Sequence, residues 1–340
     1  MSKTTASGQT RIAVIGAGSW ATALVKILSE NATVSIFWWM RSEEQMNYIQ
    51  TYRHNPKYLS DIEIDLSKVT PSTDCAECIR KAEIVVLALP AAFISACLEQ
   101  IDASNFQGKI VFSAVKGMVP ESGMLPSEYL NYHVKVAQQD IGIIAGPCHS
   151  EEVALERQSF LTVSSGASEH SEKMAALLTC RYIKTHIIDN DVQGIEYGAV
   201  MKNIFALAVG IGRGLNFGDN FQSVLVSNAM REMKRFLDHS VPKAERDMNE
   251  SAFLGDLLVT AYSPFSRNRI FGQMIGKGYT VKAAQVEMNM IAEGYYAVKS
   301  IIKKNETLGL PLPICEFVNE VVYKQSSPKK SIQKLIHSLR

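Results

Sequence analysis

One lysine lies in a stretch of sequence that is otherwise mostly apolar. The segment GIEYGAVMKNIFALAVGIGRGL begins at Gly194 and places Lys202 among apolar neighbours on a predicted helix. The small residues Gly198 and Ala199 permit close approach by another segment. A buried ammonium group loses hydration, so its pKa falls towards the range that is useful for proton transfer. The segment predicts a general acid or base at Lys202, unless this flexible side chain reaches solvent.

A second group of polar residues occurs in FLGDLLVTAYSPFSRNRIFG. Asp256 follows an apolar segment and a glycine, and Ser266-Arg267-Asn268-Arg269 ends a loop that contains serine and proline. Two guanidinium groups beside a hydroxyl and an amide suit the binding of phosphate or carboxylate. The alternative is that the serine caps a helix whose charged residues face solvent. Under the first interpretation, this cluster binds an anionic substrate.

The N-terminal segment AVIGAGSWATALVKIL joins an apolar strand to an apolar-periodic helix through a glycine turn. In such a unit the first glycine makes the tight turn, and the second lets a pyrophosphate approach the backbone. Gly16 and Gly18 occupy these positions, and Ala21 supplies the small residue that close packing needs at the third. The helix N-terminus offers free N–H donors and a partial positive charge. The pattern predicts dinucleotide binding.

The end of the second predicted strand bears on the choice between NAD and NADP. An acidic residue about 20 residues beyond the glycine turn would bind the ribose of NAD. The sequence reads SIFWWMRSEE there, with Arg41 at that point. An arginine can stack on adenine or bind a 2′-phosphate, which favours tolerance of NADP. A solvated surface arginine is the alternative.

Apolar strand-like runs and helical patterns alternate over the first part of the chain. The predicted strands are 11–15, 33–38, 83–89, 109–114 and 141–145, with 160–164 and 182–188 as candidates to extend the sheet. This alternation predicts an α/β domain over 1–190, a Rossmann-like, doubly wound parallel sheet. Long helical patterns follow at 194–211, 221–239, 281–304 and 313–323. We therefore expect 191–340 to form an all-α substrate and catalytic domain.

The composition excludes several classes of protein. Among 340 residues, 35 basic and 34 acidic side chains leave a net charge of +1, which argues against nucleic-acid binding. The only close cysteine pair, Cys75 and Cys78, lacks a second pair of ligands, so no metal site is predicted. The polar N-terminus does not resemble a signal peptide, and the most apolar run, 204–212, is too short to span a bilayer. We expect a cytoplasmic protein without stable membrane insertion.

The C-terminal segment SPKKSIQKLIHSLR predicts an amphipathic helix. One face carries four apolar residues, Ile332, Leu335, Ile336 and Leu339, and lysines lie nearby. Packing of this face on its own domain is the first interpretation. Weak attachment to a membrane surface is the alternative.

Six blocks of sequence together resemble the NAD(P)-dependent glycerol-3-phosphate dehydrogenases of the bacterial type. The blocks are GAGSWATAL, SAVKGMVPESG, GPCHSEEVA, MKNIFALAVGIGRGLNFGDN, GDLLVTAYSPFSRNRIFG and IAEGYYAVKSI, and they span most of the chain. The resemblance implies reduction of dihydroxyacetone phosphate to sn-glycerol 3-phosphate with NADPH or NADH. It also implies a role in glycerophospholipid synthesis and a homodimer.

The family pattern assigns roles to individual residues of this sequence. It implies that Lys202 donates the proton in reduction and accepts it in oxidation. The implied substrate-binding residues are Lys116, Gly146, Cys148, Lys202, Asp256, Ser266, Arg267 and Asn268. The expected cofactor-binding residues are the two glycines of the turn, Gly16 and Gly18, and eight residues that the family pattern implies: Ser19, Trp20, Arg41, Lys116, Ser150, Arg267, Ile291 and Glu293. Arg267 and Lys116 are thus expected to contact both ligands.

The chain departs from the family pattern in the block GPCHSEE. Cys148 replaces a serine that contacts substrate, which exchanges a good hydroxyl donor for a weak thiol donor. His149 replaces an aromatic residue, and Ser150 replaces a small residue on the cofactor side. Two other functions stay open: a non-catalytic NAD(P)-sensing protein on the same fold, and a dehydrogenase of another small hydroxy acid.

Overall fold

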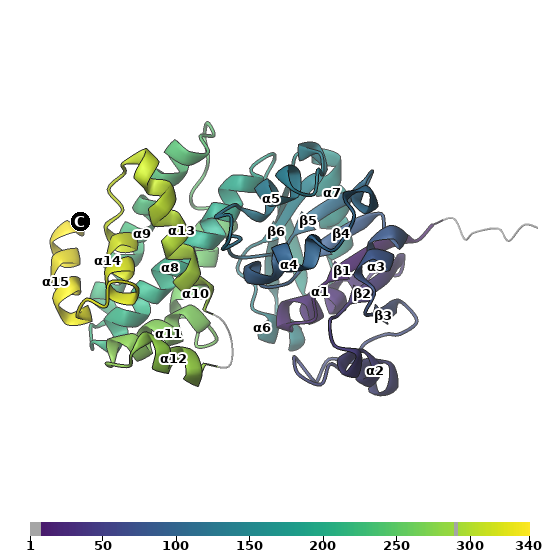
Figure 1. Cartoon of the computed structure of the whole chain (residues 1–340), viewed down its shortest axis with the longest axis horizontal. Coiled ribbons are helices and arrows are strands. Elements are labelled where there is room, and N and C mark those ends of the chain that lie inside the picture. Colours follow the sequence, from purple (N-terminus) through teal and green to yellow (C-terminus); the bar gives the residue numbers. More distant parts are fainter. Residues whose placement is uncertain (1–7, 289–291) are drawn as a thin grey trace, which may run out of the picture. The chain divides into compact units, whose positions relative to one another are not determined.

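The computed structural model describes residues 8–288 and 292–340, and the chain divides into two compact units (Figure 1). The first unit contains the described chain up to Val115, together with Pro126–Ile144 and Cys148–Val192. The second contains Gln193–Arg340 and two short stretches from earlier in the chain, Lys116–Leu125 and Ala145–Pro147. These two stretches fall inside the range expected for the dinucleotide-binding domain. They bring Lys116 and Gly146 into the unit that contains Lys202.

The first unit contains an eight-stranded sheet in the order β3-β2-β1-β4-β5-β6-β7-β8. Its strands are β1 (Thr10–Ile15), β2 (Val34–Trp39), β3 (Val69–Ser72), β4 (Ile84–Leu87), β5 (Ile110–Ser113), β6 (Ile141–Ala145), β7 (Ser159–Ser165) and β8 (Ile183–Ile187). Its α-helices are α1 (Ser19–Ser29), α2 (Glu43–Tyr52), α3 (Cys75–Lys81), α4 (Ile94–Leu98), α5 (Pro126–Tyr132), α6 (Ser150–Ala154) and α7 (Ser168–Leu178). The doubly wound, mainly parallel sheet is confirmed. Strand β3 was not predicted, because it has only four residues and includes Pro71, which suits an edge strand.

The strand order places a topological switch point beside β1. This strand pairs in parallel with β2 on one side and with β4 on the other. Its last four residues and most of α1 are buried, since the strand is covered and the helix packs its apolar face inward. Ligands of open α/β sheets bind at the carboxyl ends of strands at such a point. The glycine turn follows directly on β1.

The second unit is helical. Its α-helices are α8 (Val192–Gly214), α9 (Asp219–Ser240), α10 (Asp256–Tyr262), α11 (Arg267–Gly276), α12 (Val281–Glu287), α13 (Glu293–Leu308), α14 (Pro313–Val322) and α15 (Pro328–Ser338). A π-helical turn, η4 (Ser251–Gly255), leads directly into α10. The single helix predicted over 281–304 is wrong, because Met288 and Ala292 have extended backbone conformations that end α12 and precede α13.

Helix α8 is the core of the second unit. It is long and apolar enough to cross a membrane by length and composition, but its most apolar window is wholly buried inside the protein. Glycines bring it into backbone contact with α11: a Cβ at Gly210 would collide with the Arg269 carbonyl, and one at Gly272 with the Leu207 carbonyl. This close packing sets the start of α11 relative to α8.

The C-terminal helix α15 packs on its own unit. Ile332 and Leu335 are buried, Ile336 and Leu339 are half-buried, and the helix contacts α11 and α14. The apolar face that a membrane surface would need is therefore already covered. The structure supports the packing interpretation of this segment.

A buried carboxylate joins α9 to α14. Glu232 accepts hydrogen bonds from the backbone N–H groups of Ile314 and Cys315, at 2.8 and 2.9 Å, in the first turn of α14. Burial raises the pKa of Glu232 to about 7 from an ordinary value of 4.5, although the two N–H donors oppose the shift. The side chain therefore replaces solvent as the partner of a helix N-terminus.

Glu232 should make the stability of the protein depend on pH. Between about pH 4.5 and 7 this carboxyl is ionised in the unfolded chain and protonated in the folded one. The free energy of unfolding should therefore decrease as the pH rises through this interval and level off above it. Denaturant titrations of Glu232→Gln should lose this part of the slope. The exposed control Glu306→Gln should keep it, and an unchanged slope in Glu232→Gln would contradict the assignment.

Candidate active site

Lys202 and Asp256 form a buried ion pair in the second unit. Lys202 lies in the middle of α8, and Asp256 is the first residue of α10, directly after the π-helical turn. The side chains are 4% and 1% exposed, so Lys202 does not reach solvent as the alternative required. The second carboxylate oxygen of Asp256, Oδ2, is buried without a hydrogen-bond partner among the described residues. A hydroxyl donor placed there would satisfy it.

The surroundings of Lys202 adjust its acidity. Burial lowers its pKa to about 7 from 10.5, because the charged form loses hydration. The carboxylate of Asp256 opposes the shift, and the positive charge of Lys116 adds to it. Near neutral pH both protonation states of Lys202 are populated, as a group that gives and takes protons requires.

A chain of amides holds the residues around this pair. The Asn203 side chain donates to the Lys116 carbonyl at 2.8 Å, and Asn268 donates to Asn203 at 2.9 Å. The Gly294 backbone N–H completes the chain by donating to Asn268 at 2.8 Å. A Cβ at Gly294 would collide with the Asn203 carbonyl, so only glycine fits there. These three hydrogen bonds fix the backbone at Lys116 and the side chain of Asn268 next to Lys202.

Asn203 and Gly294 are functional candidates that the sequence analysis did not select. The signals available were an asparagine directly after the lysine, in MKN, and a glycine within IAEG. Neither residue has an ionisable group, so the sequence supported Lys202 through its neighbour Asn203 but assigned neither Asn203 nor Gly294 a role of its own. Their importance follows from hydrogen bonds between residues far apart in the chain.

The polar cluster at 266–269 begins helix α11. Ser266 is buried and its hydroxyl accepts a hydrogen bond from the Arg269 backbone N–H at 3.3 Å, as a helix cap. Arg269 turns back and donates from Nε to the Ser263 carbonyl at 3.0 Å, whereas Arg267 is exposed. The capping interpretation is therefore correct for Ser266. The first backbone N–H groups of α11 remain beside Arg267, which is compatible with an anion at this helix N-terminus.

The block GPCHSEE divides between the two units. Gly146 has φ +110°, a conformation that side chains disfavour, and Pro147 packs 3.4 Å from the position of a Cβ at Gly255 in η4. Cys148 is buried in the first unit, where Ser150 begins α6 and donates to Glu151 at 3.1 Å. Gly146 thus joins the unit of Lys202 and Asp256, whereas Cys148 and Ser150 belong to the cofactor-side unit.

The glycine turn of the first unit has the geometry of a dinucleotide cradle. Gly16 has φ +128°, and a Cβ there would collide with the Ala88 carbonyl of the loop after β4. Its own carbonyl accepts a hydrogen bond from the Trp38 indole at 2.7 Å. A Cβ at Gly18 would meet nothing within 4 Å, so open space lies in front of the first turn of α1. Ala21 is fully buried, as close helix–strand packing requires. These features fit a bound pyrophosphate.

A buried polar network supports this turn. Asn55 donates to the Thr22 hydroxyl at 2.8 Å and to the Ala17 carbonyl at 3.2 Å. Gln45 donates to the Asn55 amide oxygen at 2.9 Å and also to the Ala17 carbonyl. The sequence analysis missed Gln45 and Asn55, because neither lies within the glycine motif. They act by holding the backbone of the turn.

The other expected cofactor residues are distributed over both units. In the first unit, Ser19 begins α1, Trp20 is half-buried, and Arg41 is exposed immediately after β2. Glu293 begins α13 in the second unit, with Lys116 and Arg267. Ile291 lies outside the described residues. Within residues 8–288 and 292–340, no group of three or more His, Cys, Asp or Glu side chains could hold a metal ion.

A dinucleotide cradle at the switch point of one unit and a buried lysine–aspartate pair in a helical unit define a two-domain nicotinamide-dependent dehydrogenase. Residues 11–171 match the N-terminal domain of NAD-dependent glycerol-3-phosphate dehydrogenase, and residues 191–333 match its C-terminal domain. The chain belongs to this family.

Curated relatives and solved structures agree with this assignment. A glycerol-3-phosphate dehydrogenase [NAD(P)+] of Salinibacter ruber is 32% identical over 329 residues, covering 96% of this chain and 94% of the relative. One from Clostridium botulinum is 32% identical over 327 residues, covering 96% and 97%. The crystal structure of glycerol-3-phosphate dehydrogenase from Coxiella burnetii superimposes with a TM-score of 0.88 at 24% identity, covering 96% and 99%. The last comparison supports the fold.

Proposed function

We propose that this chain catalyses the reversible NAD(P)H-dependent reduction of dihydroxyacetone phosphate to sn-glycerol 3-phosphate. Family membership supports the reaction. The observation that carries the mechanism is the buried Lys202–Asp256 pair, whose lysine has a pKa of about 7. Turnover assays with dihydroxyacetone phosphate and either NADPH or NADH test the proposal directly.

In the proposed mechanism Lys202 handles the proton. A nicotinamide cofactor held at the glycine turn of Gly16 and Gly18 would supply the hydride that reduces the C2 carbonyl carbon. Negative charge develops on the carbonyl oxygen, and the Lys202 ammonium stabilises it and donates a proton to it. In oxidation the neutral amine accepts the proton from the C2 hydroxyl. Asp256 holds the amine in position, and its unpartnered Oδ2 can accept a hydrogen bond from a substrate hydroxyl.

The start of α11 is the proposed phosphate-binding element. Arg267 supplies a guanidinium group, and the first turn of α11 supplies backbone N–H donors and a partial positive charge. The amide chain through Asn268 and Asn203 fixes this turn relative to Lys202. Lys116, whose backbone carbonyl accepts a hydrogen bond from Asn203, is proposed to contact both substrate and cofactor.

Replacing Arg267 with alanine should raise the KM for dihydroxyacetone phosphate by roughly 10- to 100-fold. Each charged hydrogen bond lost is worth about 1.5–3 kcal/mol, and the exposure of Arg267 reduces this effect. Steady-state kinetics measure the change, with the exposed Lys299→Ala on α13 as a control for net charge. An unchanged KM would argue against a phosphorylated substrate and in favour of another small hydroxy acid.

Arg41 should favour NADPH over NADH. It follows β2 directly, no acidic residue ends that strand, and its side chain is exposed and able to reach a 2′-phosphate. Arg41→Ala should raise the KM for NADPH by roughly 5- to 10-fold, since an exposed ion pair is worth about 1 kcal/mol. The KM for NADH should change less. Equal effects on both cofactors would instead indicate stacking on the adenine.

The remaining proposals concern the setting of the reaction. The family supports a cytoplasmic enzyme whose product supplies glycerophospholipid synthesis, acting as a homodimer without stable membrane insertion or nucleic-acid binding. A non-catalytic NAD(P) sensor is the competing function, suggested by the unusual Cys148-His149-Ser150 sequence. NADPH binding without turnover of any phosphorylated ketose would favour the sensor.

A further inference from the structure

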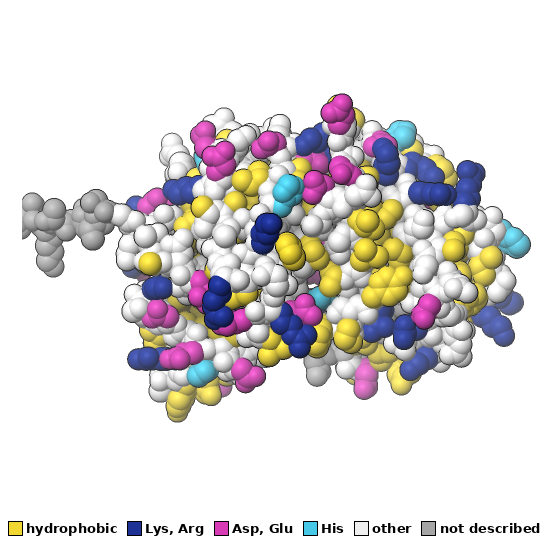
Figure 2. Space-filling model, turned by 180° about the vertical axis from the view of Figure 1, so that it is seen from behind, with side chains coloured by type: hydrophobic (Ala, Val, Ile, Leu, Met, Phe, Trp, Pro, Cys, Tyr) yellow, Lys and Arg dark blue, Asp and Glu magenta, His cyan; other side chains and the backbone are white. Residues whose placement is uncertain are grey.

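The cysteines of the first unit mark a second site more clearly than charge does. On the face shown in Figure 2, acidic and basic side chains are intermixed. By contrast, Cys75, the first residue of α3, and Cys97 in α4 have thiol groups that hydrogen-bond to each other (Figure 1). Cys78 follows one turn later on α3, close enough to Cys75 for their charges to interact. All three are free thiols, and none is assigned to substrate or cofactor.

The two hydrogen-bonded thiols differ from Cys78 in their access to solvent. Cys75 and Cys97 are half-buried, whereas Cys78 is 2% exposed. The hydrogen bond lowers the pKa of Cys97 against the effect of burial, and it raises the pKa of Cys75, to which burial and the adjacent Asp74 add. Burial raises the pKa of Cys78 to about 11. Because the thiolate is the reactive form, Cys97 is the thiol of this cluster that attacks an oxidant most readily.

We propose that Cys75 and Cys97 form a reversible disulfide when the protein meets hydrogen peroxide. The Cys97 thiolate attacks one peroxide oxygen and the O–O bond breaks, so Cys97 becomes a sulfenic acid and hydroxide leaves to take a proton from solvent. The Cys75 sulfur then attacks the Cys97 sulfur. The S–S bond forms, the S–O bond breaks, and the departing oxygen takes the Cys75 proton to leave as water. The two thiols together lose two electrons, which reduce one peroxide to two waters.

The disulfide acts on the glycine turn through the segment between β4 and α4. The Ala88 backbone N–H donates to the Ile15 carbonyl at 2.8 Å, and the Ala88 carbonyl leaves no room for a Cβ at Gly16. The 3₁₀ turn η1 (Ala91–Phe93) then leads directly into α4. An S–S bond is about 2.05 Å long, well below the separation of two thiols in contact, so its formation draws α3 and α4 together. This movement pulls on the segment that packs against Gly16, and NADPH should bind more weakly, a consequence that rests on the proposed cofactor site at this turn.

Peptide mapping after oxidation tests the disulfide independently of catalysis. The full-length protein is treated with hydrogen peroxide, its free thiols are blocked by alkylation, and its peptides are analysed by mass spectrometry. We expect a cross-link between the Cys75 and Cys97 peptides, which dithiothreitol removes by exchange. Cys180→Ser removes another half-buried thiol of the first unit and should form the same cross-link. Absence of this cross-link, or a disulfide that instead involves Cys78, overturns the proposal.

Single substitutions separate the roles of the two thiols. In Cys75→Ser the Cys97 sulfenic acid has no thiol partner, so it should oxidise further to a sulfinic acid that dithiothreitol does not reverse. In Cys97→Ser the Cys75 thiol should stay reduced under the same treatment. If Cys75 instead became the sulfinic acid in Cys97→Ser while Cys97 stayed reduced in Cys75→Ser, the assignment of Cys97 as the attacking thiol would be overturned.

NADPH binding, followed by its fluorescence, tests the effect on the glycine turn. Oxidation should raise the dissociation constant of the unsubstituted protein by roughly fivefold or more, and dithiothreitol should restore it. Cys97→Ser should show no such reversible change. An unchanged dissociation constant after disulfide formation overturns the coupling to the turn. Failure of the reduced protein to bind NADPH would instead contradict the proposed function, and the peptide map decides the disulfide in either case.

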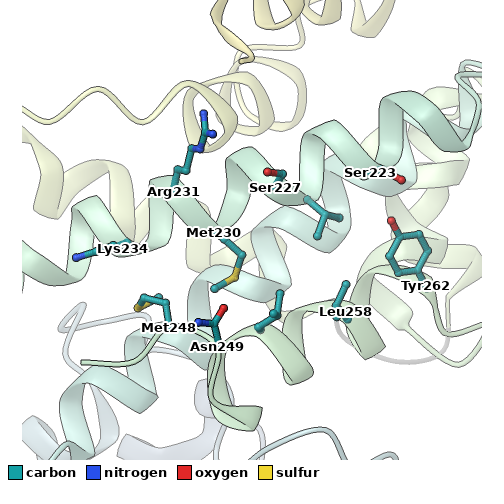
Figure 3. A pocket seen from close by; sticks show the side chains of 11 residues that line it. Ser223, Ser227, Met230, Arg231, Lys234, Met248, Asn249, Leu258 and Tyr262 are labelled. Carbon is teal, nitrogen blue, oxygen red and sulfur yellow. The ribbon is translucent and has the colours of Figure 1, made fainter. Parts of the chain in front are cut away.

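Methionine oxidation is the side reaction that this experiment must separate from the disulfide. Met230 and Met248 line a groove beside α9 in the second unit, where both are half-buried (Figure 3). Methionine sulfoxide is reduced by dedicated enzymes, whereas dithiothreitol reduces a disulfide directly. Only the part of the change in NADPH affinity that dithiothreitol reverses is therefore assigned to Cys75 and Cys97, and a wholly irreversible change counts against the proposal.

Discussion

Replacing Lys202 with alanine should lower kcat for reduction of dihydroxyacetone phosphate by about 10²–10⁴-fold, the contribution of a positioned general acid. NADPH binding, followed by its fluorescence, should be unchanged, because the glycine turn and its supporting amides belong to the other unit. Lys202→Arg should be almost as inactive, since a guanidinium keeps its proton at working pH and is too weak an acid. Retained turnover in Lys202→Ala would refute the assigned role.

The pH profile provides a second readout of the same group. Reduction needs the protonated amine, so its rate should fall as the pH rises through about 7, the pKa of Lys202. Oxidation needs the neutral amine, so its rate should rise through the same region. A reduction rate that falls and an oxidation rate that rises with the same apparent pKa would identify a single group that serves both directions. Reduction and oxidation rates that change in the same direction with pH would exclude this role for Lys202.

Replacing Asp256 with asparagine should have the other large effect. The carboxylate raises the pKa of Lys202 against the effect of burial, so its loss should lower that pKa below about 7. The falling limb for reduction should move to lower pH, and kcat at neutral pH should drop because less of the amine is protonated. Steady-state rates across pH measure both changes. If the reduction rate of Asp256→Asn fell over the same pH range as that of the unsubstituted protein, Asp256 would not influence the pKa of Lys202.

The same substitution should destabilise the protein in a pH-dependent way. Removing one partner of a buried ion pair costs about 3–5 kcal/mol when the remaining charge stays buried. At a pH well below the pKa, Lys202 is charged and the free energy of unfolding should fall by about that amount. At a pH well above it the amine is neutral and the loss should be smaller. Urea titrations measure this, with the exposed Asp61→Asn as the matched control.

Much of the cofactor side could be read from the sequence, because its signals are local. A glycine turn is a sequence of backbone requirements over six residues, and Gly16 meets them with a positive φ and a close carbonyl neighbour. Buried parallel strands are continuous apolar runs, so most of the sheet was predicted. Strand β3 lacked that signal at the edge, and the amides of Gln45 and Asn55 act on the turn from outside the motif.

The catalytic side depended more on tertiary structure. Lys202 could be selected because an ionisable residue within an apolar helix is a local anomaly. Its pairing with Asp256, 54 positions later, and the movement of its pKa to about 7 arise only when α8 and α10 pack together. The same holds for the amide chain from Gly294 to Lys116, whose members are spread over 178 positions.

The sequence alone therefore determined the kinds of chemistry available: a cofactor turn, a buried amine and a cluster of anion-binding groups. Tertiary structure decided which of them meet, since Lys116 and Gly146 leave the range of the first domain to join Lys202. The physical reason is that backbone conformation and burial patterns depend on near neighbours in the chain. Electrostatic interactions and side-chain hydrogen bonds depend on distances of a few ångströms, which only the packed fold sets.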